Sequence, residues 1–89
     1  MGFLERRRAK RVQAITDDGN ALFEWALAIS REGPREKAIE LFVAKVRREK
    51  VSKEAVQFAF GRTVGKHLEA FAVLYQGIGR LTETLEARG

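Results

Sequence analysis

The chain has 89 residues, of which 45% are hydrophobic and 33% are charged, and its formal net charge at pH 7 is +5. These values are typical of one small globular domain and exclude an intrinsically disordered chain, which has too few apolar residues to form a core. Because the chain has no cysteine, a disulfide framework and a thiolate metal site are also excluded. We expect a cytoplasmic protein that acts without catalysis and without a cofactor, since no nucleophile or phosphate-loop motif is present.

The first third of the chain is expected to contain a basic helix followed by a second helix. Apolar or small residues recur in one helical phase as far as Ile29, but the sequence Asp-Asp-Gly-Asn at 17–20 favours a turn. We therefore expect helices at about 4–16 and 20–32, with a bend or break between them. The sequence leaves open whether the basic segment 1–16 is flexible.

The next helix should begin at Pro34, because glycine, here Gly33, ends helices and proline suits the first turn of the helix that follows. Its expected range is 34–50. The residues that this helix should turn inward are Ala38, Ile39, Phe42, Val43 and Val46, with Leu41 to one side. Ser52 is a natural N-cap for the helix that comes next.

The C-terminal region allows two interpretations. Its apolar residues keep three- and four-residue steps that one helix over 53–87 would satisfy, but such a helix would be about 50 Å long, which is excessive for a small domain. We favour a short helix at 53–61 and a long one at 64–87, with Thr63 as a cap. No strand pattern is present. The expected fold is all-α, a bundle of about four helices with a long C-terminal helix, in a single domain over 1–89.

The positive charge is concentrated in two segments. The net charge of +5 lies entirely in residues 1–53, whereas residues 54–89 carry equal numbers of acidic and basic side chains. The basic residues are Arg6, Arg7, Arg8, Lys10 and Arg11 in the first segment and Lys45, Arg47, Arg48, Lys50 and Lys53 in the second. Although Lys45 can pair with Glu49, most of these residues have no acidic partner three or four positions away. The pattern therefore predicts contact with an external polyanion.

Nucleic acid is the favoured partner, either DNA or RNA, in the setting of a larger nucleoprotein complex. In one alternative, the charged runs are simply solvated surfaces. In another, the protein is a helical adaptor or assembly subunit whose basic face binds an acidic protein. An anionic membrane surface is disfavoured, and nothing in the sequence is apolar enough to span a membrane.

Two further features concern anions and DNA. If the last helix begins near Thr63, then Arg62, Thr63 and Lys66 would surround free backbone N–H groups and form a weaker third anion site. Residues 53–75 also have lengths compatible with a helix-turn-helix, whose second helix would offer Lys66 and His67 to a DNA groove. Few polar side chains lie at the start of that helix, so we favour binding to the phosphate backbone.

Small residues indicate a contact between copies of the chain. Gly65, Ala72 and Gly79 recur every seven positions in the last predicted helix, and side chains this short let another helix approach closely. We therefore expect a homo-oligomer formed through this helix. His67, the only histidine, is expected to be structural, and Trp25 is expected in the core, with stacking on a base as the alternative.

Overall fold

The computed structural model describes the backbone of residues 3–88 and the side chains of residues 9–87, and every regular element in this part of the chain is a helix. The helices are α1 (Phe3–Glu32), α2 (Arg35–Glu49), α3 (Lys53–Thr63) and α4 (Leu68–Arg88). These elements confirm the prediction of an all-α bundle of four helices. The expected long C-terminal helix is α4, which has 21 residues.

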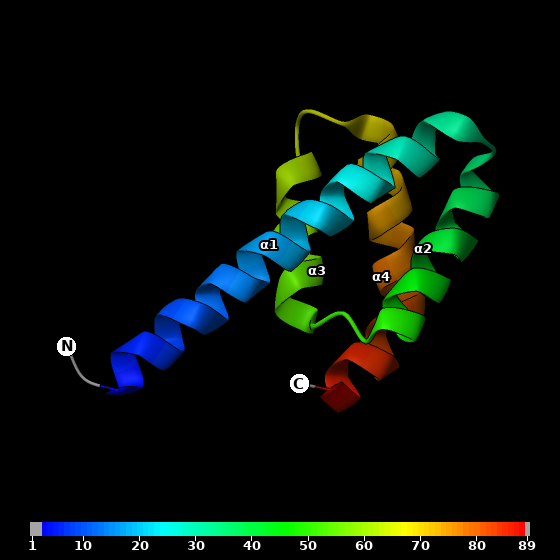
Figure 1. Ribbon diagram of the computed structural model, residues 1–89. Coiled ribbons are helices and arrows are strands. Elements are labelled where there is room, and N and C mark those ends of the chain that lie inside the picture. The colour runs from blue at the N-terminus through cyan, green and yellow to red at the C-terminus, as the bar shows by residue number, and fades with distance from the viewer. Residues whose placement is uncertain (1–2, 89) are drawn as a thin grey trace.

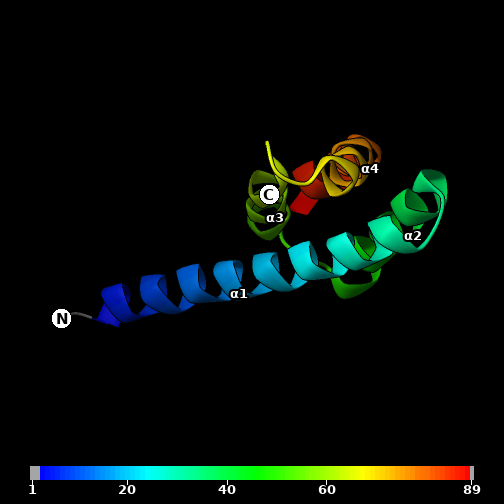
Figure 2. The same cartoon turned by 90° about the horizontal axis from the view of Figure 1, so that it is seen from above.

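Two helix pairs build the body of the protein. α1 packs mainly on α3, and α2 packs mainly on α4, while α3 and α4 also contact each other. Figure 1 shows α1 crossing the body obliquely, with its N-terminal half continuing beyond the other helices, and the view from above in Figure 2 shows the same extension. The molecule is therefore elongated, with principal extents of 49 × 27 × 19 Å.

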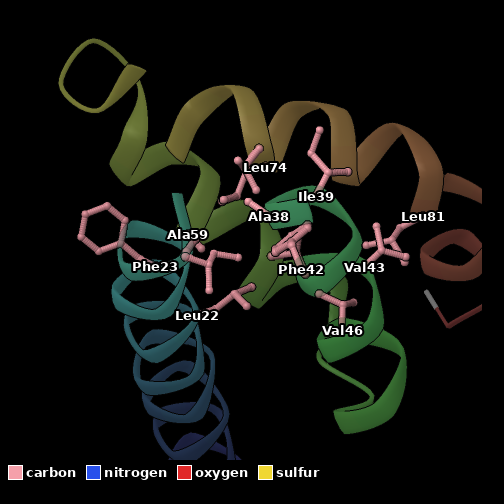
Figure 3. Packing of buried hydrophobic residues seen from close by; sticks show 14 of the residues in the cluster. Leu22, Phe23, Ala38, Ile39, Phe42, Val43, Val46, Ala59, Leu74 and Leu81 are labelled. Carbon is pink, nitrogen blue, oxygen red and sulfur yellow. The ribbon is translucent and has the colours of Figure 1, made fainter. Parts of the chain in front are cut away.

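The core forms where the apolar faces of all four helices meet. Phe42 of α2 is completely buried and lies between side chains of the neighbouring helices (Figure 3). The inward face predicted for α2 is confirmed, because all five of its expected residues are buried. The other helices contribute Leu22, Phe23, Ala26 and Ile29 from α1, Val56 and Ala59 from α3, and Val73, Leu74, Leu81 and Leu85 from α4.

The break predicted at residues 17–20 is wrong, because α1 runs through them as one helix. Gly19 is buried against α3, and a Cβ atom added to it would lie 2.9 Å from the Cβ of Phe58. The glycine thus allows a close approach of two helices and does not form a turn. The Gln13 amide also donates a hydrogen bond of 2.9 Å to Asp17 one turn later, which supports the helix at this point.

The connections on either side of α2 follow the sequence signals closely. Pro34 was expected in the first turn of this helix, but it lies one position before α2, as its N-cap, with extended backbone angles. At the other end Lys50 adopts the left-handed conformation, with a φ angle of 51°, and its backbone N–H donates to the carbonyl of Val46. The predicted N-cap of α3 is confirmed, because the Ser52 hydroxyl accepts a hydrogen bond of 3.2 Å from the backbone N–H of Ala55.

The connection between α3 and α4 is longer than the sequence indicates. The two expected helices exist, but α3 continues to Thr63 and α4 starts only at Leu68. Thr63 is therefore not the cap of the last helix. It is fully buried in the last turn of α3, where its hydroxyl donates a hydrogen bond of 2.7 Å to the carbonyl of Phe60. Gly65 has a φ angle of 75°, a conformation that side chains disfavour, and so shapes the turn.

The predicted row of small residues does not form as one stripe on α4. Gly65 lies in the preceding turn, Ala72 is half-buried, and Gly79 is exposed with nothing within 4 Å of where its Cβ would be. The glycine of α4 that packs closely is Gly77. A Cβ atom there would lie 2.6 Å from Cε1 of Phe42, so this glycine makes room for the central ring of the core.

Candidate nucleic-acid interface

The first basic segment belongs to the part of α1 that extends beyond the body, residues 3–16, which we call the arm (Figures 1 and 2). Residues 9–14 are all exposed. Within the described side chains, no carboxylate forms an ion pair with Lys10 or Arg11. Arg6, Arg7 and Arg8 belong to the first turns of the arm, but their side chains lie outside the described residues. The arm thus presents basic side chains to solvent.

The second basic segment begins on the last turns of α2. The predicted pair is present, because the Lys45 ammonium donates a hydrogen bond of 2.7 Å to the Glu49 carboxylate. Arg48 approaches the same carboxylate oxygen at 3.4 Å. The hydrogen bond from Lys45, with a smaller contribution from Arg48, holds the pKa of Glu49 below its usual value. One carboxylate therefore partly neutralises two cations.

The remaining cations of this segment surround the end of α2 and do not form one flat face. Arg47 lies on another side of the helix, in a shallow pocket that also holds Glu40 and Arg80. Lys53, at the start of α3, forms an ion pair of 3.1 Å with Glu86. Lys50 is exposed at the left-handed end of α2.

A hollow of about 330 Å³ lies between the middle of α1 and the end of α2. Its lining consists of Asp18, Ala21, Leu22 and Trp25 from α1 and Lys45, Glu49, Lys50 and Val51 from the end of α2 and the residues after it. The Lys45 ammonium is 4.9 Å from the centroid of the Trp25 ring, which is within the range of a cation–π contact. Trp25 packs against the core, as expected, but it is only half-buried and also faces this hollow.

The arm and the hollow lie on the same side of α1. Arg11, Asp18 and Trp25 are seven residues apart, and residues at this spacing are close in angle around a helix because two turns contain about 7.2 residues. The row therefore leads from an exposed arginine of the arm to the hollow where Lys45 and Lys50 lie. The fold thus places cations of both basic segments on the same side of one continuous helix, with Arg11 about two helical turns before the hollow.

The third predicted anion site does not have the expected geometry. Arg62 donates a hydrogen bond to the side-chain oxygen of Asn20, and its guanidinium carbon lies 4.1 Å from the centroid of the Phe23 ring. This arginine therefore takes part in packing between α3 and α1. Lys66 is exposed in the turn before α4, and Thr63 is buried, so the three residues do not surround the start of that helix.

The structure also does not place the polar residues where a helix-turn-helix would need them. Lys66 and His67 precede α4 and are not on it, and the first residue of that helix is Leu68, which is 81% exposed. His67 is half-buried, with its ring edge on Phe23 at a centroid distance of 5.4 Å. This packing contact agrees with the structural role expected for the histidine, and the first turn of α4, residues 68–71, contains no basic residue that could read a groove.

Sequence reasoning did not identify Asp18 as part of a charged site. The seven-residue spacing of Arg11, Asp18 and Trp25 was visible in the chain, but the predicted break at residues 17–20 separated the first of them from the third. That they approach the end of α2 follows only from the tertiary packing of the two helices.

Comparisons with protein-family models, with curated proteins and with solved structures found no match to this chain. Among the described helices, none is both long enough and apolar enough to cross a bilayer. Within the same residues, no group of three or more histidine, aspartate or glutamate side chains is arranged to hold a metal ion.

Proposed function

We propose that the protein binds nucleic acid without catalysis, by contacting phosphates along a basic track that joins the arm to the end of α2. The track consists of Lys10, Arg11, Lys45, Arg48 and Lys50. The observation that supports it best is the row from Arg11 to Trp25, which places an arginine of the arm on the side of α1 where Lys45 and Lys50 are found.

The charge distribution supports a backbone contact and not a sequence-specific one. Cations on an exposed helix can release counterions from several phosphates, and this term supplies most non-specific affinity. The hollow is bordered by Trp25, whose accessible part could also contact a base, although the ring packs mainly on the protein core. Because contacts to phosphates carry no direct sequence information, affinity should depend weakly on sequence.

A titration at several salt concentrations tests the proposal. If about five phosphates are neutralised, log Kobs for duplex DNA should fall with log[salt] with a slope of about −4 to −5, since each phosphate contributes about 0.9. Single-stranded DNA, RNA and anionic vesicles should be measured in parallel, because they separate the two nucleic acids from a general anionic surface. No binding to any nucleic acid at about 50 mM salt would contradict the proposal.

Charge removal gives a sharper test with a matched control. The double change Arg11→Gln and Lys50→Gln should reduce the magnitude of the slope by about 2, because two phosphate contacts are lost. Arg31→Gln, at the exposed far end of α1, should leave the slope unchanged. Equal effects of all these changes would indicate that net charge alone, and not the track, governs binding.

Removing a negative charge should have the opposite effect. Asp18 borders the hollow and would repel a phosphate placed there, so Asp18→Asn should tighten binding. Glu24, which is also exposed on α1 but does not line the hollow, provides the control as Glu24→Gln. An acidic protein bound by the basic face, the alternative considered from the sequence, is favoured if nucleic acid fails in these assays.

A further inference from the structure

The outer side of α3 and α4 carries an apolar surface that the fold leaves open. Its aromatic rings contact one another, with centroid distances of 5.1 Å between Phe60 and Phe71 and 6.0 Å between Phe71 and Tyr75. Tyr75 nevertheless remains 64% exposed. We call this surface the aromatic face, and its members are Phe60, Phe71, Tyr75 and Ile78.

A groove of about 450 Å³ runs through the aromatic face. It is lined by Gln57 and Phe60 of α3 and by Tyr75, Ile78 and Gly79 of α4. The face therefore combines a large projecting ring with an apolar depression beside it. Two such surfaces related by a two-fold axis can each place the ring of one in the depression of the other, as isologous contacts require. We infer that the aromatic face binds a second copy of this chain, face to face.

The distribution of charge favours a second copy over a polyanion at this face. All residues of the face and its groove belong to the segment 54–89, which has equal numbers of acidic and basic side chains. Two copies can therefore approach through α3 and α4 without net repulsion, whereas a nucleic acid or an anionic lipid surface would gain little there. The surplus of positive charge lies in residues 1–53, and Lys53, at the start of α3, is already paired with Glu86.

In the inferred dimer, the helix of the second copy approaches the backbone of α4 most closely at Gly79. A glycine in the interior of a helix is destabilising relative to alanine, and at Gly77 this cost is explained by the ring of Phe42. At Gly79 no atom of the described chain lies within 4 Å of a Cβ position, so nothing within the protomer requires the space. A helix of the second copy lying over the groove would occupy this space. The inference goes beyond nucleic-acid binding and is tested without any nucleic acid present.

Sedimentation equilibrium over a concentration series provides the first test. Wild-type protein should form a dimer, and Tyr75→Asp should raise the dimer dissociation constant by about 30-fold or more, as expected for a central aromatic residue of an interface. Leu41→Asp is the matched control, because Leu41 is an exposed leucine of α2 away from the groove. Unchanged far-UV circular dichroism will verify that both variants fold.

A second measurement locates the contact, and it exploits the absence of cysteine from the chain. Gly79→Cys should give a disulfide-linked dimer under mild oxidation, whereas Gly33→Cys, in the exposed turn between α1 and α2 with equal free space, should not. Wild-type protein that stays monomeric up to about 0.5 mM would overturn the inference. Equal weakening by Tyr75→Asp and Leu41→Asp, or cross-linking only through residue 33, would overturn the assignment to this face.

Discussion

The two halves of α1 are one helix with two different environments. From Gly19 onward the helix packs on α3 and the core, with Leu22, Phe23 and Ala26 almost completely buried. Among the described side chains of the arm, residues 9–14 are exposed, and Val12 is 61% exposed although it continues the apolar pattern of the chain. The same backbone geometry is therefore maintained by packing in one half and by helix propagation in the other.

This difference shows where the stability of the protein resides. A helix that propagates from a packed segment gains one hydrogen bond for each residue fixed, so it does not need its own nucleus. Its residues, however, bury little apolar surface and can open locally without unfolding the body. Substitutions in the arm should consequently change binding more than stability, whereas substitutions in the core should do the reverse.

The largest effect is expected at the centre of the body. Phe42→Ala should lower the free energy of unfolding by about 3–5 kcal/mol, because it leaves a cavity beneath three helices. For a domain of this size such a loss consumes a large part of the total stability. Urea denaturation followed by circular dichroism will measure it. A loss below about 1 kcal/mol would mean that the core rearranges around the missing ring.

A matched pair of glycine substitutions on α4 should give effects of opposite sign. Gly77→Ala should cost about 1–3 kcal/mol, because the new methyl group would collide with the buried ring of Phe42. Gly79→Ala meets open space within the protomer and should stabilise the monomer by about 0.5–1 kcal/mol through helix propensity. Melting at low protein concentration, where a dimer is not populated, will compare the two. Equal destabilisation would contradict the tight packing assigned to Gly77 alone.

The smallest effect is expected in the arm. Val12→Ala removes an exposed branched side chain and inserts the strongest helix former, so the free energy of unfolding should change by no more than about 0.5 kcal/mol. Amide hydrogen exchange should also be faster at residues 9–16 than at the buried half of α1. A loss of stability near that of Phe42→Ala would show that the arm is covered in solution, and the comparison of the two halves would then fail.

Much of the fold could be predicted because local chemistry and tertiary packing agree. The limits and the inward face of α2 follow from Gly33, Pro34 and a regular apolar period, and the start of α3 follows from Ser52. At these places the residues that begin and end helices lie directly beside the apolar pattern, so periodicity and capping indicate the same element.

The errors arose where a glycine has more than one use. Gly19 stands among turn-forming residues, but its burial against Phe58 depends on a contact 39 positions away, which no local pattern contains. In α4 the heptad spacing drew attention to Gly79, although Gly77 lies between Leu74 and Leu81 on the buried stripe. That phase could have identified Gly77 as a core position.

The prediction of the site met a similar limit. The sequence shows which residues are cations, but it does not show that Arg62 is bound to Asn20 and Phe23 or that Lys53 pairs with Glu86. Such long-range partners decide how many charges remain accessible. Composition therefore overstates the number of available cations.

The continuity of α1 through residues 17–20 has a mechanical consequence. Without a hinge there, the arm is a strut about 21 Å long at 1.5 Å per residue, and its direction is fixed by the packed half of the same helix. Under the proposed function, a duplex lying along the arm would be contacted over about six base pairs at 3.4 Å each. Inserting one or two residues near position 17 would rotate the outer cations by about 100° per residue around the helix axis, and under the proposed function this would change the orientation of the bound nucleic acid.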